Sequence, residues 1–289
     1  MVLGPCTFSV DEYQCSCRAG ETIATGTLDD RSICRKCLHP IAAHKDFPEQ
    51  VPGPKPETDI LRDSPEFTPR TRTVTKLAEI LDKQRVVHVR GVPSSGKTTL
   101  SQFLSSHLKS RGETVYSMPM WSTNRLALDQ VLSLCLPPEH RSETNLLRLP
   151  VVVIIDEAQY SYSDSRLWYV VIKSVLGSST GIRICLLSSY GSPSTGAPEE
   201  DYPRDITPPV LGPSGRVTLT VSTEFGAPDI CLFYSVEEFT DAVDRFCIFS
   251  VRNEFTLHAD PREYIFRLSN GHPGVVFSLL RYVHVVRAT

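Results

Sequence analysis

The chain contains 289 residues, of which 40% are hydrophobic and 22% are charged, and its formal net charge is −3. This composition is typical of a folded globular protein with one large domain or two ordinary ones. It excludes a disordered chain, and so small a net charge gives no reason to expect nucleic-acid binding. No apolar run approaches the roughly 20 residues that a membrane span requires. The first residues show no basic segment followed by an apolar core, so we expect an intracellular protein of the cytoplasm or nucleus, with non-classical export left open.

The front of the chain is rich in cysteine and histidine. Five of the nine cysteines fall within the first 37 residues, and an odd total clustered in this way indicates a reducing compartment. A C-x-C pair and a C-x₂-C pair with flanking histidines can close a tetrahedral Zn²⁺ site, which would stabilise a segment too short to bury a core. The alternative is a set of reactive thiols without metal. The zinc ligands that we favour are Cys15, Cys34, Cys37 and His44, with Cys17 or His39 as substitutes.

Composition divides the chain into four parts. Residues 1–46 form the Cys/His-rich segment, and residues 47–72 are rich in proline and poor in apolar residues, which predicts an extended linker. The regular pattern begins at residue 73, and we expect an α/β core over residues 73–234. The last part, residues 235–289, has helical periodicity throughout and predicts a small helical domain.

Hydrophobic periodicity predicts strands that alternate with helices in the core. This alternation predicts a parallel central sheet with helices on both faces, a three-layer α/β fold. Thr73 is the expected N-cap of the first helix, and Gly112 and Gly177 close two later ones. In chain order we expect helix 73–85, strand 86–92, helix 97–112, strand 114–118, a helix around 124–135, strand 151–156, helix 165–177, strands 182–188 and 217–221, and then helices 235–247, 260–270 and 273–286.

The most specific motif lies between the first strand and the second helix. The stretch GVPSSGKTT fits G-x-x-x-x-G-K-[ST] without a mismatch. In such a loop the backbone N–H groups and the helix N-terminus converge on phosphate oxygens, the lysine reaches the β- and γ-phosphates, and the hydroxyl after it coordinates Mg²⁺. A glycine-rich strand-to-helix turn is the structural alternative. The expected nucleotide-binding residues are Gly91, Pro93, Ser94, Ser95, Gly96, Lys97, Thr98 and Thr99.

Two adjacent carboxylates end the apolar strand VVVIIDEAQ. Because an unpaired buried charge is costly, these acids either mark where the strand reaches water or face something positive. After a phosphate loop the second explanation is favoured, and we expect this strand to lie beside the phosphate-loop strand. Asp156 would then support the Mg²⁺ shell together with Thr98, and Glu157 would orient or deprotonate the attacking water. The alternative for Glu157 is that it only tunes the site.

One strand further on, the stretch IRICLLSSYGS ends in two serines and a tyrosine. We expect Ser188 to sense the γ-phosphate or to position water, and the alternative is an ordinary turn residue.

Several of these stretches together resemble the P-loop ATPase module of Crinkler-type (CRN) proteins of fungi and oomycetes, which is related to the AAA+ and STAND groups. They are GVPSSGKTTL, IIDEAQYSYSD, SSYGS and SNGHPGVV, and the resemblance covers roughly residues 73–287. It implies a magnesium-dependent ATP hydrolase core with a helical lid, whose turnover drives a conformational or assembly switch. His272 maps onto the lid turn near the nucleotide, for which an ordinary helix start is the alternative. The candidates for an arginine finger are Arg125, Arg183 and Arg281.

Two further functions stay open. Thymidine kinases also pair a G-K-[ST] loop with a D-E-A-Q motif and carry a zinc module, although in those enzymes this module follows the core. A nucleotide-gated interaction module would bind ATP with little turnover and contact a protein partner or a second copy. The preference for ATP over GTP rests on the resemblance and on the lack of an N-K-x-D guanine-reading motif after the phosphate loop.

Overall fold

The computed structural model describes most of the regular part of the chain. The described residues are 65–119, 121, 146–162, 164, 166–189, 211–251 and 256–288, together with 2–3, 9–10, 13–14, 17–18 and 20–21. By its contacts the chain divides into two compact units, Met1–Ile60 and Leu61–Thr289. In the first unit, two-residue strands pair antiparallel: β1 (Val2–Leu3) with β4 (Gly20–Glu21), and β2 (Ser9–Val10) with β3 (Tyr13–Gln14).

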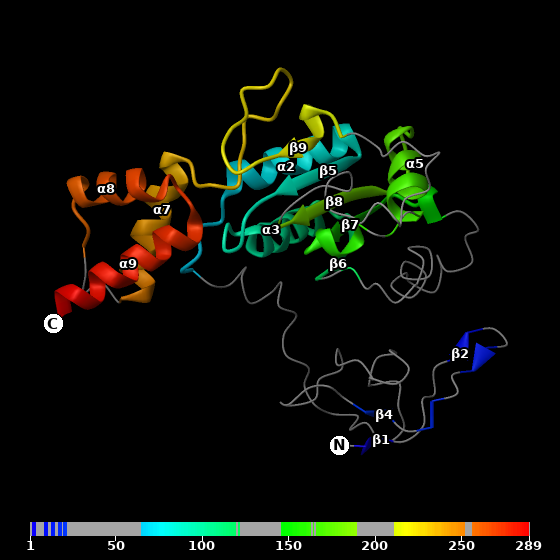
Figure 1. Cartoon of the computed structure of the whole chain (residues 1–289), viewed down its shortest axis with the longest axis horizontal. Coiled ribbons are helices and arrows are strands. Elements are labelled where there is room, and N and C mark those ends of the chain that lie inside the picture. Colours follow the sequence, from blue (N-terminus) through cyan, green and yellow to red (C-terminus); the bar gives the residue numbers. More distant parts are fainter. Residues whose placement is uncertain are drawn as a thin grey trace. The chain divides into compact units, whose positions relative to one another are not determined.

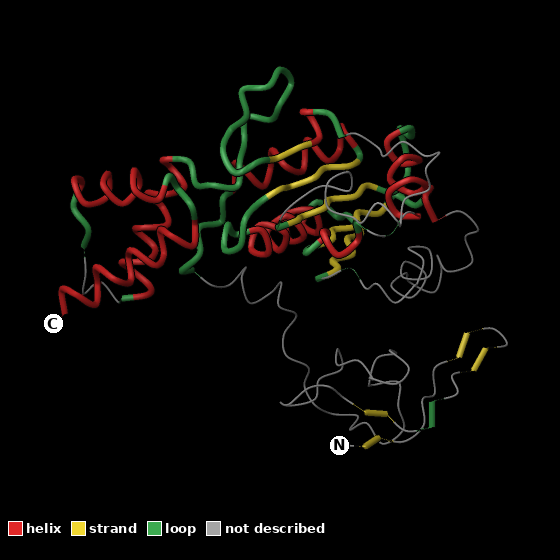
Figure 2. The backbone as a smooth tube through the Cα atoms, viewed as in Figure 1, coloured by secondary structure: helices red, strands yellow, loops and turns green. Residues whose placement is uncertain are grey.

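The second unit is built on a five-stranded sheet with the strand order β6-β7-β8-β5-β9 (Figures 1 and 2). Every pair of neighbouring strands in this sheet is parallel. This confirms the predicted α/β fold with a parallel sheet and fits a P-loop NTPase. The strands are β5 (Val86–Arg90), β6 (Thr114–Met118), β7 (Val151–Ile155), β8 (Arg183–Ser188) and β9 (Arg216–Val217).

The helices follow the predicted order. The helix expected around 124–135 lies outside the described residues, and none of the described helices is long and apolar enough to cross a membrane. The α-helices are α2 (Thr71–Gln84), α3 (Lys97–Ser110), α5 (Lys173–Leu176), α7 (Val236–Arg245), α8 (Ala259–Ser269) and α9 (Pro273–Ala288). The π-helical segments are η5 (Arg166–Ile172) and η8 (Phe246–Ser250), and the 3₁₀ turns are η3 (Leu146–Arg148), η4 (Ala158–Ser161) and η7 (Pro213–Gly215).

The strand β7 explains the layering, because all five of its residues are buried and successive side chains point to opposite faces of the sheet. Val152 and Ile154 pack in one hydrophobic cluster with the apolar stripes of α2 and α3. Val153 and Ile155 pack in the other cluster, around Trp168 of η5. Each face of the sheet is therefore covered by helix, as a three-layer fold requires.

The expected neighbour of β7 was wrong. We expected this strand beside the phosphate-loop strand β5, but β8 lies between them and pairs with both. Local periodicity identifies a buried strand but carries no information on which of several similar strands it pairs with. As a consequence, the carboxyl end of β8 stands between the phosphate loop and the two acids that follow β7.

Several element boundaries differ from the prediction by a few residues, and for two of them tertiary contacts give the reason. The N-cap of α2 is Arg70 rather than Thr73, whose hydroxyl donates to Glu238 Oε1 at 2.5 Å. The last strand ends at Val217 instead of residue 221, because the next carbonyls, from Thr218 onward, accept N–H groups from the segment that leads to α7.

The helical lid, α7 to α9, has a hydrophobic core of its own. Phe239 and Val243 of α7 are buried against Ile265 of α8 and Leu280 of α9. A complete capping box starts α7: Ser235 Oγ accepts from the N–H of Glu238, and the Glu238 carboxylate accepts from the N–H of Ser235. The lid is thus a folded element rather than a set of separate helices (Figure 1).

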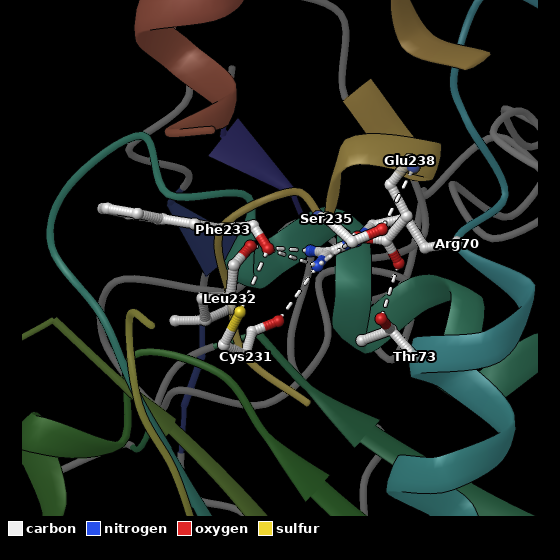
Figure 3. Close-up of polar contacts among 7 residues, drawn as sticks. All are labelled: Arg70, Thr73, Cys231, Leu232, Phe233, Ser235 and Glu238. Atoms are coloured by element: carbon white, nitrogen blue, oxygen red, sulfur yellow. Dashed lines mark hydrogen bonds and ion pairs between the residues drawn. The ribbon is translucent and has the colours of Figure 1, made fainter. Parts of the chain in front are cut away.

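Arg70 joins this lid to the core (Figure 3). Its guanidinium is 5% exposed and donates to the carbonyls of Leu232 at 2.9 Å, Cys231 at 3.0 Å and Phe233 at 3.3 Å. Its Nε and Nη2 also donate to Glu238 Oε2 at 3.1 and 3.0 Å. The chain before α2, the segment before α7 and α7 itself therefore meet at one side chain.

We expect Arg70→Ala to lower the free energy of unfolding by about 3–5 kcal/mol, because it leaves three carbonyls and a carboxylate that is only 11% exposed without their donor. The matched control is Arg72→Ala: Arg72 pairs with Asp229 at 2.8 Å, but both side chains are more than half exposed. Such a pair contributes about 1 kcal/mol or less. Urea unfolding of both variants measures the difference, and similar midpoints for the two would contradict the role of Arg70.

Candidate functional site

The phosphate loop lies between β5 and α3, as its sequence predicts. Gly91 begins the loop in a tight position, since a Cβ there would lie 2.4 Å from Ser95 Oγ and 2.6 Å from a methyl carbon of Leu232. Its N–H donates to the carbonyl of Ser188, at the end of β8, at 3.0 Å. Gly96, the last residue before α3, has a φ of +83°, a conformation that glycine adopts at little cost. Glycine is thus required at the two positions for different reasons: lack of space at Gly91 and a left-handed backbone at Gly96.

The start of α3 presents free donors to the loop. The first backbone hydrogen bond of this helix runs from Leu100 N–H to the carbonyl of Gly96 at 2.9 Å. Within the described part of the chain, the N–H groups of Lys97, Thr98 and Thr99 therefore have no acceptor. A phosphate group is the natural acceptor for such N–H groups at a helix N-terminus.

Lys97 lies against its own loop. Its Nζ donates to the carbonyl of Val92 at 2.9 Å, and the residue is 5% exposed. Burial lowers the pKa of the Lys97 ammonium, while the nearby carboxylates of Glu157 and Asp156 oppose this shift. The ammonium is thus held by a neutral carbonyl that a phosphate oxygen can replace.

Thr98 and Asp156 come together at the carboxyl edge of the sheet. Thr98 Oγ1 donates to Asp156 Oδ2 at 2.6 Å, and the other carboxylate oxygen accepts from the N–H of Glu157 at 2.9 Å. Burial raises the pKa of the Asp156 carboxyl, although the Thr98 hydrogen bond acts in the opposite direction. A hydroxyl and a carboxylate beside a phosphate loop are oxygen donors of the kind that Mg²⁺ takes together with substrate phosphates and water. The residues present therefore fit this ion.

Glu157 has a left-handed backbone, with a φ of +46°, which is uncommon for a residue other than glycine. Its Oε2 accepts hydrogen bonds from the amide of Gln159 and, at 3.2 Å, from Ser189 Oγ. Gln159 Oε1 in turn accepts the N–H of Ser189 at 3.0 Å. A network that the sequence did not predict thus links the ends of β7 and β8.

The structure does not bring Ser188 to the loop cavity. Its side chain is fully buried, and its Oγ lies 2.8 Å from Nε2 of His88, within the core beside Trp168. The next residue, Ser189, reaches Glu157 and lines the cavity. Side chains alternate along a strand, so a shift of one residue exchanges the core side for the site side.

The lid turn, residues 271–274, packs directly on the phosphate loop. Gly274 N–H donates to the carbonyl of Ser94 at 3.1 Å, and a Cβ on Gly274 would lie only 2.7 Å from Ser94 Cβ. A Cβ on Gly96 would lie 3.5 Å from the ring of Pro273. His272 instead faces the aromatic ring of Phe233, with ring centroids 5.0 Å apart. The expected residue His272 does not line the cavity, whereas its neighbour Pro273 does.

A cavity of about 650 Å³ opens between the loop, the chain before α2 and the lid. This volume lies within the range of small-molecule and cofactor sites. Its polar lining comes from two sides: the loop and the strand ends contribute Ser94, Gly96, Lys97, Thr98, Thr99, Glu157 and Ser189, and the chain before α2 and before α7 contributes Glu66, Thr68, Arg70 and Tyr234. Its apolar lining includes Pro93 of the loop, Phe67 and the lid residues Phe246, Val276, Phe277 and Leu280.

Some expected residues lie elsewhere. Ser95, inside the loop, is buried and donates to the carbonyl of Val92 at 2.8 Å, so it shapes the loop from within. Phe67 lines the cavity, although it lies in the segment that was predicted to be a linker. The only indication in the sequence was that it is an isolated aromatic residue among prolines. Arg183 is engaged by Asp82 and Glu113 at the start of β8, away from the loop edge.

For the other two arginine-finger candidates, Arg281 and Arg125, this role stays a prediction. Arg281 lies over the ring of Phe277, 5.4 Å from its centroid, and Arg125 lies outside the described residues.

The zinc site stays a prediction. Cys15, Cys34, Cys37, His39 and His44 lie outside the described residues, while Cys17 lies within them. Within the described ranges, no group of three or more His, Cys, Asp or Glu side chains is arranged to hold a metal ion.

Comparisons with known proteins find a likeness among solved structures. No family model matches the chain, and no curated protein matches it. Among solved structures, the chain is similar to the Walker-type ATPase PABY2304 of Pyrococcus abyssi, with 15% identity, a TM-score of 0.41 and coverage of 74% of this chain and 67% of that one. This likeness does not extend to the Crinkler family, so that resemblance stays a prediction. The P-loop class rests on the sheet, the loop and the acids described above.

We expect Gly274→Ala to lower the free energy of unfolding by about 1–3 kcal/mol, because the added methyl group forces α9 away from the phosphate loop. Gly212→Ala is the matched control: no atom lies within 4 Å of its added Cβ, and its φ of −63° suits alanine. This control should be neutral or slightly stabilising. Thermal unfolding of the two variants tests the contact, and a neutral Gly274→Ala would contradict it.

His88 gives a prediction on pH. Burial lowers the pKa of its imidazole to about 3, whereas the unfolded chain has the ordinary value near 6.5. Between these values only the unfolded state binds the proton, so stability falls as the pH falls, by roughly 1.4 kcal/mol per pH unit below about pH 6.

His88→Gln should remove this contribution from the pH slope of the unfolding free energy, whatever it does to the absolute stability. His258→Gln, at an exposed position, is the control and should keep the slope. Urea unfolding at several pH values between 4 and 7 measures it. An unchanged slope in His88→Gln would show that this imidazole is not the acid-sensitive group.

Proposed function

We propose that the protein binds a nucleoside triphosphate, in the first place ATP, together with Mg²⁺, and hydrolyses its terminal phosphate. The observation that carries this proposal is the Thr98–Asp156 contact of 2.6 Å beside a loop with unengaged N–H groups and a buried lysine. Two segments that are distant in the sequence supply these groups. The start of α3 lines the cavity, and Asp156 precedes Glu157, which also lines it.

The proposed roles follow from the chemistry of each group. The N–H groups of α3 and the ammonium of Lys97 bind the phosphates, and Thr98 and Asp156 hold the ion. When bound, Mg²⁺ offsets the negative charge of the β- and γ-phosphates. Glu157 accepts a proton from water as the water oxygen bonds to the γ-phosphorus. The bond from this phosphorus to the bridging oxygen breaks, and the nucleoside diphosphate leaves with the electron pair.

The apolar part of the cavity supports a site for the base. Phe67, Phe246 and Phe277 line it, and aromatic side chains accept the face of any nucleobase. Preference for adenine rests on the resemblance to Crinkler-type ATPases and on the lack of a guanine-reading motif.

The contact between the lid turn and the loop supports a switch. Gly274 of the lid binds the carbonyl of Ser94, inside the loop that would wrap the phosphates. A change of phosphate content would therefore act on the lid, and through the lid on self-association or on a protein partner. The Cys/His-rich front, with the proposed Zn²⁺ site, would serve as a small recognition or stabilising module.

We expect Lys97→Ala to weaken nucleotide binding roughly 10- to 100-fold, because it removes a charge-assisted contact to phosphate. Glu157→Gln should bind nucleotide as the wild type does and lose roughly 10²–10⁴-fold in hydrolysis. Lys76→Ala is the control, since this lysine pairs with Glu79 on the exposed side of α2. Isothermal titration with ATP and Mg²⁺ and a phosphate-release assay provide the two measurements.

The outcomes separate the alternatives. Wild-type protein without Lys97-dependent binding contradicts the proposal. Binding without turnover in the wild type would make the chain a nucleotide-gated interaction module. Phosphorylated thymidine, formed when thymidine is added, would make it a nucleoside kinase.

A further inference from the structure

Gln159 is a buried amide placed between the ends of two strands. The residue is 7% exposed and follows β7 by four positions, in the short turn η4. Its Oε1 accepts the N–H of Ser189 at 3.0 Å, and its Nε2 donates to Glu157 Oε2. A buried side-chain amide with both ends engaged has a defined orientation and restrains the groups that it joins.

The backbone of Ser189 decides which way this amide faces. An N–H group can only donate, so the oxygen of Gln159 must point toward Ser189. The NH₂ group must then point toward Glu157, where it can only donate to the carboxylate. The arrangement is specific for glutamine, because a glutamate at this position would present a second acceptor to the first.

The two oxygens of the Glu157 carboxylate have different surroundings. Oε2 accepts from Gln159 and, at 3.2 Å, from Ser189 Oγ. No described residue donates a hydrogen bond to Oε1, and Glu157 lines the cavity. Oε1 is thus the oxygen that is available to accept a proton.

The same end of β8 also holds the phosphate loop. Ser188 accepts the N–H of Gly91 through its carbonyl at 3.0 Å, and the next residue, Ser189, donates to Gln159. This carbonyl and this N–H belong to one peptide group, which therefore links the start of the loop, through Gln159, to the carboxylate of Glu157. The left-handed backbone of Glu157, which costs energy by itself, is kept within this set of contacts.

We propose that Gln159 is a positioning residue for hydrolysis: it fixes the Glu157 carboxylate with Oε2 engaged and Oε1 free for the attacking water, in register with the phosphate loop. This inference rests on the proposed function. Gln159 itself touches neither the water nor the phosphates and acts through Glu157.

The decisive variant is Gln159→Met, which keeps the length of the side chain and removes both hydrogen bonds without adding charge. We expect kcat for ATP to fall 10- to 100-fold, because a misplaced reacting group loses about this factor. KM and the Kd for ATP should change less than threefold, since no contact to the nucleotide is removed. Gln84→Met is the matched control: Gln84 ends α2 at the opposite edge of the sheet and accepts from Ser214, so kcat and KM should stay unchanged.

A double-variant cycle separates positioning from general support of the fold. If Gln159 acts through Glu157, Gln159→Met should cause no further loss of single-turnover rate once Glu157→Gln is present. A merely structural glutamine would slow both backgrounds by the same factor, and that result overturns the inference. So does a Gln159→Met variant with the kcat of the wild type.

An exchange of the two side chains tests the contact between Gln159 and Glu157 through stability, without an activity assay. It therefore remains informative if Gln159→Met does not fold. Gln159→Glu alone sets two carboxylates against each other and should lower the urea midpoint at neutral pH. The exchange Glu157→Gln with Gln159→Glu restores one amide facing one carboxylate, so we expect the midpoint to recover while hydrolysis stays lost. A midpoint that does not recover overturns the pairing.

Failure of the proposed function has a different signature. A wild type that binds ATP but does not hydrolyse it removes the reaction that Gln159 would serve, and the inference falls with it. A wild type that hydrolyses ATP and is indifferent to Gln159→Met overturns the inference alone.

Discussion

The arrangement of the cavity depends on one buried guanidinium. Arg70 enters the space between the core and the lid and satisfies three carbonyls and a carboxylate there. A buried charge of this kind adds little net stability compared with an apolar replacement, but removing one partner is expensive, so the pair acts as a constraint on geometry. Glu238 carries the other half of this constraint, because it also caps α7 and accepts from Thr73. The first turn of α2 and the first turn of α7 are therefore fixed to the same carboxylate.

A series of contacts connects the Arg70–Glu238 pair to the phosphate loop. The Arg70 guanidinium lies over the ring of Tyr234, 5.2 Å from the ring centroid. The backbone N–H of Tyr234 donates to the carbonyl of Gly271 at 2.8 Å. Gly271 opens the lid turn, and Gly274 at the other end of that turn binds Ser94. The turn is thus held from the core through Arg70 and from the loop through Ser94. The cavity is lined by the loop, the chain before α2 and the lid, and these two attachments connect all three of them.

The parts that sequence predicted are those whose chemistry is local. A phosphate loop needs its glycines and lysine within a few consecutive residues, and an acid at the end of an apolar strand is visible without knowledge of neighbours. The strand order was not predictable in this way, because β7 and β8 are similar apolar runs and their pairing is a matter of the whole sheet. The position of Ser188 was not predictable for a similar reason, since one residue of register decides which serine side chain faces His88 and which faces Glu157. Thr73 looked like a cap, but its hydroxyl is used by a glutamate 165 positions away. Gln159 was visible in the D-E-A-Q stretch, yet its role required the backbone of another strand.

The strand order also explains how loop and acids can act together. With β8 between β5 and β7, the loop and the acid pair are not joined directly but through the carboxyl end of β8, whose carbonyl and N–H groups bind one to each side. The Lys97 ammonium donates to the Val92 carbonyl, which a phosphate oxygen would replace. The Ser94 carbonyl accepts from Gly274 of the lid, and a movement of the lid would break this hydrogen bond. A ligand can shift such an arrangement only by the difference in its affinity for the two states. In the proposed function, the phosphates compete with the Val92 carbonyl for Lys97 while Gly274 binds the same loop, and these contacts are the physical basis of a link between nucleotide binding and the lid. Such a link is reciprocal: a ligand of the lid that changes the affinity for nucleotide has its own affinity changed by the same factor when nucleotide is bound.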